Sequence, residues 1–246
     1  MVDREELKNY CNTYLDIGKF KDYCPNGLQI EGSLNITKIV SGVSANLELI
    51  ERAIEEKADA IFVHHGVFWD KESKTLTGAK KTKIALLLKH NINLFGFHLP
   101  LDDHCEVGNN VELGRRLGVK NMEPVQGGLL WQGELRTNLS DFSKLIEEKL
   151  DRAPQIFGKQ SGEIKKIAWC TGGAQGFIED AISLNVDLYL SGEVSEQTPA
   201  VAKENNITFI SAGHHATERY GVQALCNHLC SQFKLQHQYI EVDNSV

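Results

Sequence analysis

The chain has 246 residues, of which 41% are hydrophobic and 24% charged, which fits a globular protein with one large domain or two smaller ones. A formal net charge of −7 argues against non-specific binding to nucleic-acid phosphates. The N-terminus is charged and no run of about 18 apolar residues follows, so we expect neither a signal peptide nor a membrane span and predict a cytoplasmic protein. The cysteines lack paired spacing and are expected to be reduced thiols.

Apolar periodicity predicts alternating helices and strands in the first half of the chain. In chain order we expect a helix over 3–16, a turn at 24–27 leading to a short strand or edge hairpin, a strand over 36–43, a helix from 47 to about 58, a strand over 60–63, a helix around 84–88 and a strand over 92–97. Two of these strands are followed by polar side chains, which is typical of an α/β protein with chemistry at the carboxyl ends of its strands.

The strand over 60–63 ends at His64 and His65. Neighbouring side chains on a strand point to opposite faces, so we do not expect this pair to bind one ion together. The two rings would serve two ions, or one ion and one substrate group. A purely structural explanation, with one ring in the core and the other in solvent, stays open at this point.

The later half of the chain repeats the plan of the first half. The matched positions, at one constant offset, are Lys38 with Lys166, Ile50 with Ile178, and Asp59 with Asp187. On the same register His64 and His65 fall on Gly192 and Glu193. Further on, Asn91-Ile92-Asn93-Leu94 resembles Asn206-Ile207-Thr208-Phe209, after which one inserted residue brings His98 and Asp102 opposite His214 and Glu218. We therefore predict an α/β fold of two similar halves, made by internal duplication, with mixed sheets and a pseudo-two-fold axis.

The predicted domain ranges are 1–120 for the first half, 121–165 for a small inserted α/β lobe and 166–246 for the second half. Within the insertion we expect a strand over 129–135, and Ser140 is expected to cap the helix that follows.

The histidines and carboxylates that follow the strands indicate a metal site. The candidate ligands are His64, His65, Asp102, His214 and Glu218. Imidazole nitrogens and carboxylate oxygens suit Fe, Zn, Mn, Co or Ni, and the lack of thiolates argues against structural zinc. If the chain is helical after residue 213, His214 and Glu218 share one face, and this carboxylate can bridge two ions about 3.5–4 Å apart.

Several alternatives stay open on the residues alone. His215 can replace His214 as a ligand, Asp102 can simply end a strand or cap a helix, and Glu218 can pair with Arg219. Candidates for proton transfer are Glu193, Glu196 and His98. The segment Cys170-Thr171-Gly172-Gly173 is interpreted as a tight turn rather than an anion site.

Five segments together resemble one known family. They are Pro25-Asn26-Gly27-Leu28-Gln29, Val63-His64-His65-Gly66, His98-Leu99-Pro100-Leu101-Asp102, Gly192-Glu193-Val194-Ser195-Glu196-Gln197 and Gly213-His214-His215-Ala216-Thr217-Glu218-Arg219. Their types and order are similar to the NGG-interacting-factor-three-like dinuclear-metal family, whose members are often called GTP cyclohydrolase 1 type 2 homologues. The resemblance extends over nearly the whole chain.

The resemblance implies a dinuclear centre of two divalent metal ions. His64 and Asp102 would hold one ion and His65 and His214 the other, with Glu218 as the bridge. It also implies a toroidal homohexamer. The implied function is that of a metal-dependent hydrolase, GTP cyclohydrolase-like, acting on a nucleotide or related small molecule. The alternative is a non-catalytic metal-binding or scaffold protein that forms an oligomeric ring.

Overall fold

Each copy of the predicted repeat folds into three parallel strands joined by helices. The first copy comprises β4 (Lys38–Ser44), α2 (Leu47–Glu55), β5 (Ala60–His65), α3 (Gly78–Lys89) and β6 (Asn93–Gly96). The second comprises β10 (Glu163–Cys170), α7 (Ile178–Ser183), β11 (Leu188–Ser191), α8 (Thr198–Glu204) and β12 (Thr208–Ser211). These elements come from a computed structural model that describes residues 1–246.

Two matched aspartates hold the start of the repeat in the same way in both copies. Oδ2 of Asp59 accepts the two backbone N–H groups of Thr37–Lys38, at 2.8 and 3.0 Å. Oδ2 of Asp187 accepts those of Lys165–Lys166 at the same two distances, 2.8 and 3.0 Å. These residues are related by the constant offset of the sequence alignment, so the two copies share backbone detail as well as apolar periodicity.

The chain divides into two compact units. Unit 1 consists of Met1–Gly108 and Gly221–Asp243, and unit 2 of Asn109–Tyr220 and Asn244–Val246. The predicted α/β class with two similar halves and mixed sheets is confirmed. None of the helices has the length and apolar character needed to cross a bilayer.

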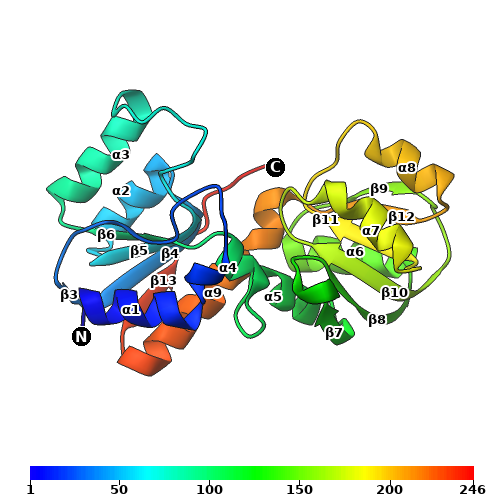
Figure 1. The fold of residues 1–246 in the computed structure, drawn as a ribbon, viewed down its shortest axis with the longest axis horizontal. Helices are drawn as coiled ribbons and strands as arrows, with labels where there is room; N and C mark the ends of the chain where they lie inside the picture. Colours follow the sequence, from blue (N-terminus) through cyan, green and yellow to red (C-terminus); the bar gives the residue numbers. More distant parts are fainter. The chain divides into compact units, whose positions relative to one another are not determined.

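Unit 1 contains a five-stranded sheet in the order β13-β4-β5-β6-β2. At its edges, β13 (Gln236–Tyr239) runs parallel to β4, and β2 (Gly27–Ile30) runs antiparallel to β6. Phe62 and Phe95 face the layer made by α1 (Arg4–Tyr14) and the later part of α9 (His214–Phe233). Ile61 and Leu94, one residue away on the same strands, face α2 and α3 on the opposite side (Figure 1).

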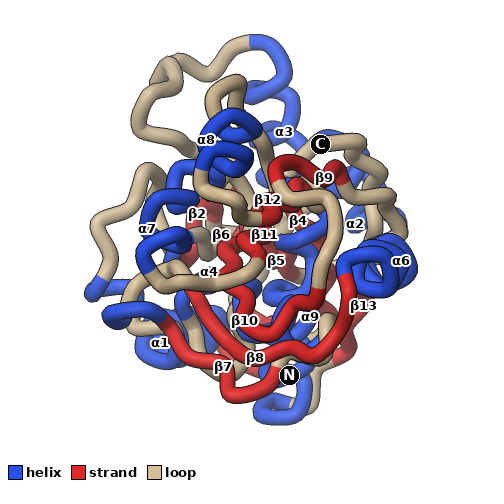
Figure 2. Tube along the Cα trace, turned by 90° about the vertical axis from the view of Figure 1, so that its right-hand side faces the viewer, coloured by secondary structure: helices blue, strands red, loops and turns tan.

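Unit 2 contains a six-stranded sheet in the order β7-β8-β10-β11-β12-β9. The added strands are β7 (Lys120–Pro124), β8 (Trp131–Asn138) and β9 (Gln155–Gly158). Trp169 and Leu190 face α6 (Leu139–Leu150), whereas Tyr189 and Phe209 face α7 and α8. Figure 2 shows β10, β11 and β12 between α6 and α7. Helices on both faces therefore bury the parallel strands in each unit.

The remaining elements are short. They are β1 (Val2–Asp3), which pairs with β3 (Asn35–Ile36), the 3-10 turns η1 (Ile17–Lys19), η2 (Val125–Gly127) and η3 (Gln175–Phe177), α4 (Leu99–Asp103) and α5 (Asn109–Arg116).

The observed division differs from the predicted ranges 1–120, 121–165 and 166–246. The strands β7, β8 and β9 extend the sheet of unit 2 and do not form a lobe of their own. The C-terminal strand β13 returns to the sheet of unit 1, where it covers the edge of β4. Both differences have one cause, because the unpaired backbone groups of an edge strand favour pairing with any further strand in reach.

The predicted cap of α6 is wrong by two residues. The helix begins after Asn138, whose Oδ1 accepts the backbone N–H of Asp141 at 3.0 Å, so Ser140 lies inside the first turn. Asparagine is as good an N-cap as serine, and the residue types alone do not separate the two.

Candidate metal centre

The buried strand β5 ends at His64 and His65, and their rings lie together. The ring centroids are 4.6 Å apart, and one nitrogen from each of His64, His65 and His98 lies within 4.8 Å of the others. The prediction that the two rings point to opposite faces is therefore wrong. They are the last two residues of the strand, where long side chains that lean along the strand direction can meet beyond the end of the sheet.

A hydrogen bond fixes the protonation of His64. Nδ1 of this fully buried ring lies 2.9 Å from the carbonyl oxygen of Phe97, which can only accept, so Nδ1 carries the proton. Nε2 then holds the lone pair that a metal ligand needs. Nδ1 of His65 lies 3.0 Å from the hydroxyl of Ser44, which can donate or accept.

Asp102 lies inside the short helix α4 and neither ends a strand nor caps a helix. Its side chain is nearly buried, and Oδ1 lies 3.6 Å from Nε2 of His64. Two ligand atoms that are each about 2.1 Å from one ion, at a tetrahedral angle, lie roughly 3.4 Å apart. The spacing of this pair therefore fits a shared ion.

His98 is held by Asn26, which belongs to the predicted turn, and by Asp22, which no sequence pattern indicated. Its Nδ1 donates to Oδ1 of Asp22 at 2.7 Å, and its backbone N–H donates to Asn26 at 2.7 Å. The second oxygen of Asp22 accepts from the side chain of Asn26 at 2.8 Å and from the backbone N–H of Leu99 at 2.9 Å. Burial raises the pKa of Asp22, but the hydrogen bonds from His98 and Asn26 outweigh burial and lower it to about 2.

Cys24 completes a second cluster with Asp22 and His98, within 4.8 Å. Burial raises the pKa of its thiol to about 12, and nearby carboxylates add to the effect. A metal would need the thiolate, so this cysteine is a poorer ligand than the histidines.

In unit 2, the first turn of α9 brings His214 and Glu218 to one face, as predicted. Nε2 of His214 lies 3.0 Å from Oε2 of Glu218, and Nδ1 lies 2.6 Å from Oε1 of Glu193. Burial lowers the pKa of His214, but the two carboxylates outweigh it and raise the pKa to about 9. In the metal-free protein the ring is therefore a cation between two carboxylates, and a divalent ion at Nε2 would replace one proton.

The neighbouring His215 has a different environment. It is 8% exposed, and its backbone N–H donates to the carbonyl of Val246 at 3.0 Å. His214, and not His215, has its ring between Glu193 and Glu218. Glu196 is exposed in the loop before α8.

The glycine turn after β10 forms a wall beside the bridging candidate. Gly172 has a φ of 67°, and a Cβ built on it would lie 1.9 Å from Oε1 of Glu218. Its backbone N–H donates to the hydroxyl of Thr217 at 3.0 Å. The predicted tight turn is present, and it also excludes any side chain from the space that Glu218 occupies. In the sequence, only the pair Gly172-Gly173 indicated this turn.

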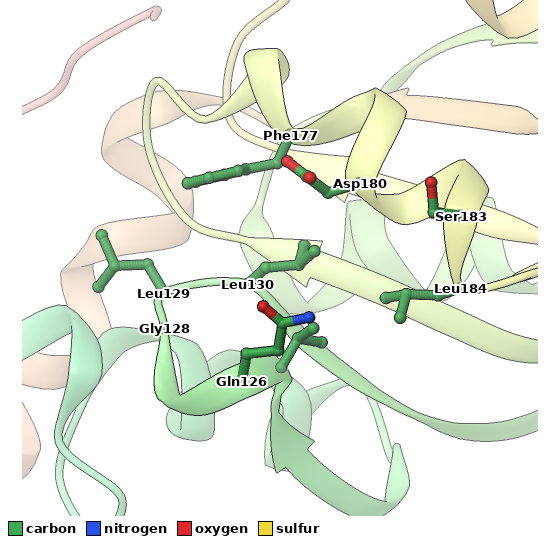
Figure 3. Close-up of a pocket in the computed structure, with 9 residues that line it drawn as sticks. Gln126, Gly128, Leu129, Leu130, Phe177, Asp180, Ser183 and Leu184 are labelled. Carbon is green, nitrogen blue, oxygen red and sulfur yellow. The ribbon is translucent and has the colours of Figure 1, made fainter.

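Each unit contains a cavity. One of about 560 Å³ is in unit 1 and includes Trp69, whose ring centroid is 5.8 Å from that of His65 and 5.3 Å from that of His98. The other, of about 320 Å³, is in unit 2, where Phe177 and Asp180 lie across from Leu129 and Gln126 (Figure 3). The first one has a side chain, that of Trp69, in ring contact with candidate ligands.

Comparison with known proteins gives one family. The family described as Duf34/NIF3 (NGG1p interacting factor 3) matches residues 2–245. A relative from Allochromatium vinosum, named GTP cyclohydrolase 1 type 2 homolog, is 49% identical over 99% of this chain and 98% of its own length. A relative of the same name from Escherichia coli is 42% identical over 97% of this chain and 98% of its own length.

Solved structures have the same fold over the full chain. One, described as protein ybgI of unknown function, has a TM-score of 0.95 at 40% identity and covers 100% of both chains. A structure from Thermus thermophilus has a TM-score of 0.91 at 31% identity, also with 100% coverage of both chains.

Proposed function

Because the chain belongs to the Duf34/NIF3 (NGG1p interacting factor 3) family, we propose that it is a dinuclear-metal-dependent hydrolase acting on a nucleotide or related small molecule. Family membership itself agrees with the resemblance found in the sequence. Clusters of histidine and carboxylate side chains able to bind metal are present in the structure. The number of ions, their identity and the reaction belong to the proposal.

One observation carries the proposal. His64 and His214 each have Nδ1 tied to an acceptor while Nε2 faces a carboxylate oxygen, at 3.6 and 3.0 Å respectively. At His64, Nε2 holds a lone pair, which repels a carboxylate oxygen unless a cation lies between them. At His214 a proton supplies that positive charge in the metal-free protein, and a divalent ion would replace it. Histidines oriented through their other nitrogen are the usual arrangement at metal centres. The donors therefore fit Fe, Zn, Mn, Co or Ni.

The proposed ligand assignment follows the family resemblance. His64 and Asp102 would hold one ion and His65 and His214 the other, with Glu218 as the shared ligand. Two divalent ions at such ligands supply Lewis acidity, which makes water more acidic and polarises a carbonyl or phosphoryl group. The predicted toroidal homohexamer and the cytoplasmic location stay predictions.

The proposal gives His98 and Glu193, two of the three predicted candidates for proton transfer, different roles. His98 donates from Nδ1 to Asp22, so its Nε2 is the acceptor and is suited to take a proton from water or substrate. Asp22 holds this tautomer, as the acid does in a histidine–aspartate pair. Glu193 binds Nδ1 of His214 and mainly orients that ring. Loss of Glu193 should therefore weaken metal binding as well as turnover.

A screen of nucleotides, phosphoesters and cyclic amides with metal-loaded protein tests the proposed reaction. We expect turnover of at least one compound by the wild type and by Glu204→Ala, which removes an exposed carboxylate at the end of α8. The same turnover should be lost in Glu218→Ala. Turnover that survives in Glu218→Ala would place the activity elsewhere. Bound metal without turnover of any compound would favour the non-catalytic metal-binding or scaffold alternative.

A further inference from the structure

The cavity of about 560 Å³ in unit 1 has the size of a small-molecule site. It is lined by Pro25, by residues between β5 and α3, which include Phe68, Trp69 and Lys74, and by Lys80 in the first turn of α3. Two of these side chains are aromatic and two are cationic. Asp70 and Glu72 also line the cavity, so the lining offers flat apolar surface together with charges of both signs.

Trp69 is the side chain that joins this cavity to the candidate ligands. It lines the cavity, and its ring contacts those of His65 and His98, with centroids 5.8 and 5.3 Å away. The segment that carries it is anchored, because the backbone N–H of Asp70 donates to the carbonyl of Tyr23 at 2.8 Å. A molecule lying on Trp69 would thus be beside the rings proposed to act on it.

The two lysines of the cavity have different environments. Lys80 lies 5.2 Å from the ring centre of Phe68, and its Nζ contacts the carboxylate of Glu72 at 3.4 Å and the carbonyl of Ser73 at 3.2 Å. These contacts make Lys80 part of the cavity wall. Lys74 is exposed in the same loop, where an anionic group of a ligand can reach it.

We propose that this cavity binds a planar heteroaromatic ring with an anionic substituent, which stacks on Trp69 and places its anion at Lys74. The inference rests on the proposed function, whose substrate it narrows. An aromatic wall favours a flat ring over an aliphatic phosphoester, because every heteroaromatic base has a face that stacks on indole. A nucleotide has both the ring and the anion.

Three probes distinguish the contribution of the ring to binding from that of the anion. Their binding to the full-length, metal-loaded protein is measured by calorimetry. They are GMP, guanosine without the phosphate, and ribose 5-phosphate without the ring. We expect GMP to bind about tenfold more tightly than ribose 5-phosphate, in line with the usual strength of stacking between a base and an aromatic side chain. Trp131 and Trp169 are buried, so quenching of the more exposed Trp69 by GMP gives an independent signal.

Matched variants assign the effect to the named side chains. Trp69→Leu should remove most of the preference for GMP over ribose 5-phosphate, whereas Trp69→Phe should keep it. Lys74→Gln should weaken the binding of GMP about threefold and leave the binding of guanosine unchanged, as expected for one exposed charge. Lys81→Gln removes an exposed charge from α3 outside the cavity and should bind like the wild type.

Equal binding of GMP and ribose 5-phosphate by the wild type, or full GMP binding by Trp69→Leu, would overturn the inference. Metal content is measured on the same samples, so the inference and the proposed function can fail separately. Ring-independent binding by protein that retains its metal contradicts only the inference. Ring-dependent binding by protein that takes up no metal supports the inference and contradicts the proposed function.

Discussion

His214 shows the electrostatic character of the candidate metal centre most clearly. Its ring lies between Glu193 and Glu218, which raise its pKa to about 9 in spite of burial. A histidine whose pKa is raised on folding stabilises the metal-free fold fully below its unfolded pKa of about 6.5, and this contribution is lost as the pH rises through about 9. The two carboxylates therefore favour a positive charge at this position, whether a proton or a metal ion carries it.

Glu193→Gln tests this electrostatic account at the residue scale. Removing one carboxylate should lower the pKa of His214 from about 9 toward its ordinary value, as measured by NMR titration of the metal-free protein. The stability difference from the wild type should be largest below about pH 6.5 and shrink toward pH 9. An unchanged pKa would mean that Glu193 does not act on the ring.

The identities of the ligand candidates could be predicted at this scale, but their supporting partners could not. His64, Asp102 and His214 stood out because imidazole and carboxylate groups followed predicted strands. Asp22 had no such signal, because its hydrogen bond to His98 connects positions 76 residues apart. Contacts of this kind depend on the tertiary fold and leave no local pattern.

At the scale of elements, the glycine turn after β10 controls the position of Glu218. Gly172→Ala would place a methyl group 1.9 Å from the Glu218 carboxylate, on a backbone with a φ of 67°. We expect loss of metal uptake and a fall in unfolding free energy of roughly 1–3 kcal/mol from strain alone. Metal content and chemical denaturation measure the two effects.

Gly176→Ala is the matched control, because a Cβ there meets nothing within 4 Å. It should take up metal and unfold like the wild type. Equal behaviour of Gly172→Ala and Gly176→Ala would show that the turn does not shape the site.

The matched aspartates give a second prediction at this scale. Asp59→Ala and Asp187→Ala each remove two hydrogen bonds from backbone N–H groups to a carboxylate. Each should lower the unfolding free energy by roughly 2 kcal/mol. Asp180→Ala, at an exposed position of α7, should change it little. A large effect of only one aspartate in denaturant titrations would contradict equivalent roles in the two copies.

Strands and helices with strong periodicity were predicted well, and their assembly less well. The strand ends at His64 and His98 and the helical turn from His214 to Glu218 follow from local apolar spacing. The addition of β7, β8 and β9 to one sheet and of β13 to the other depends on which strand edges are available. The opposed side-chain directions predicted for His64 and His65 were wrong, because these residues end the strand and their long side chains can meet beyond the sheet.

At the scale of the whole molecule, the family resemblance adds a prediction about assembly. We expect six chains per particle in sedimentation velocity, as the toroidal homohexamer requires. A sedimenting species of one or two chains at micromolar concentration would contradict it.

The central claim is that the chain holds a dinuclear metal centre, and counting metal equivalents tests it most directly. Purified protein, loaded and desalted, should contain two equivalents per chain by elemental mass spectrometry. The metal content should fall below two equivalents in His65→Ala and in Glu218→Ala, whereas Glu204→Ala should retain two equivalents. Retention of two equivalents in both His65→Ala and Glu218→Ala would contradict the account.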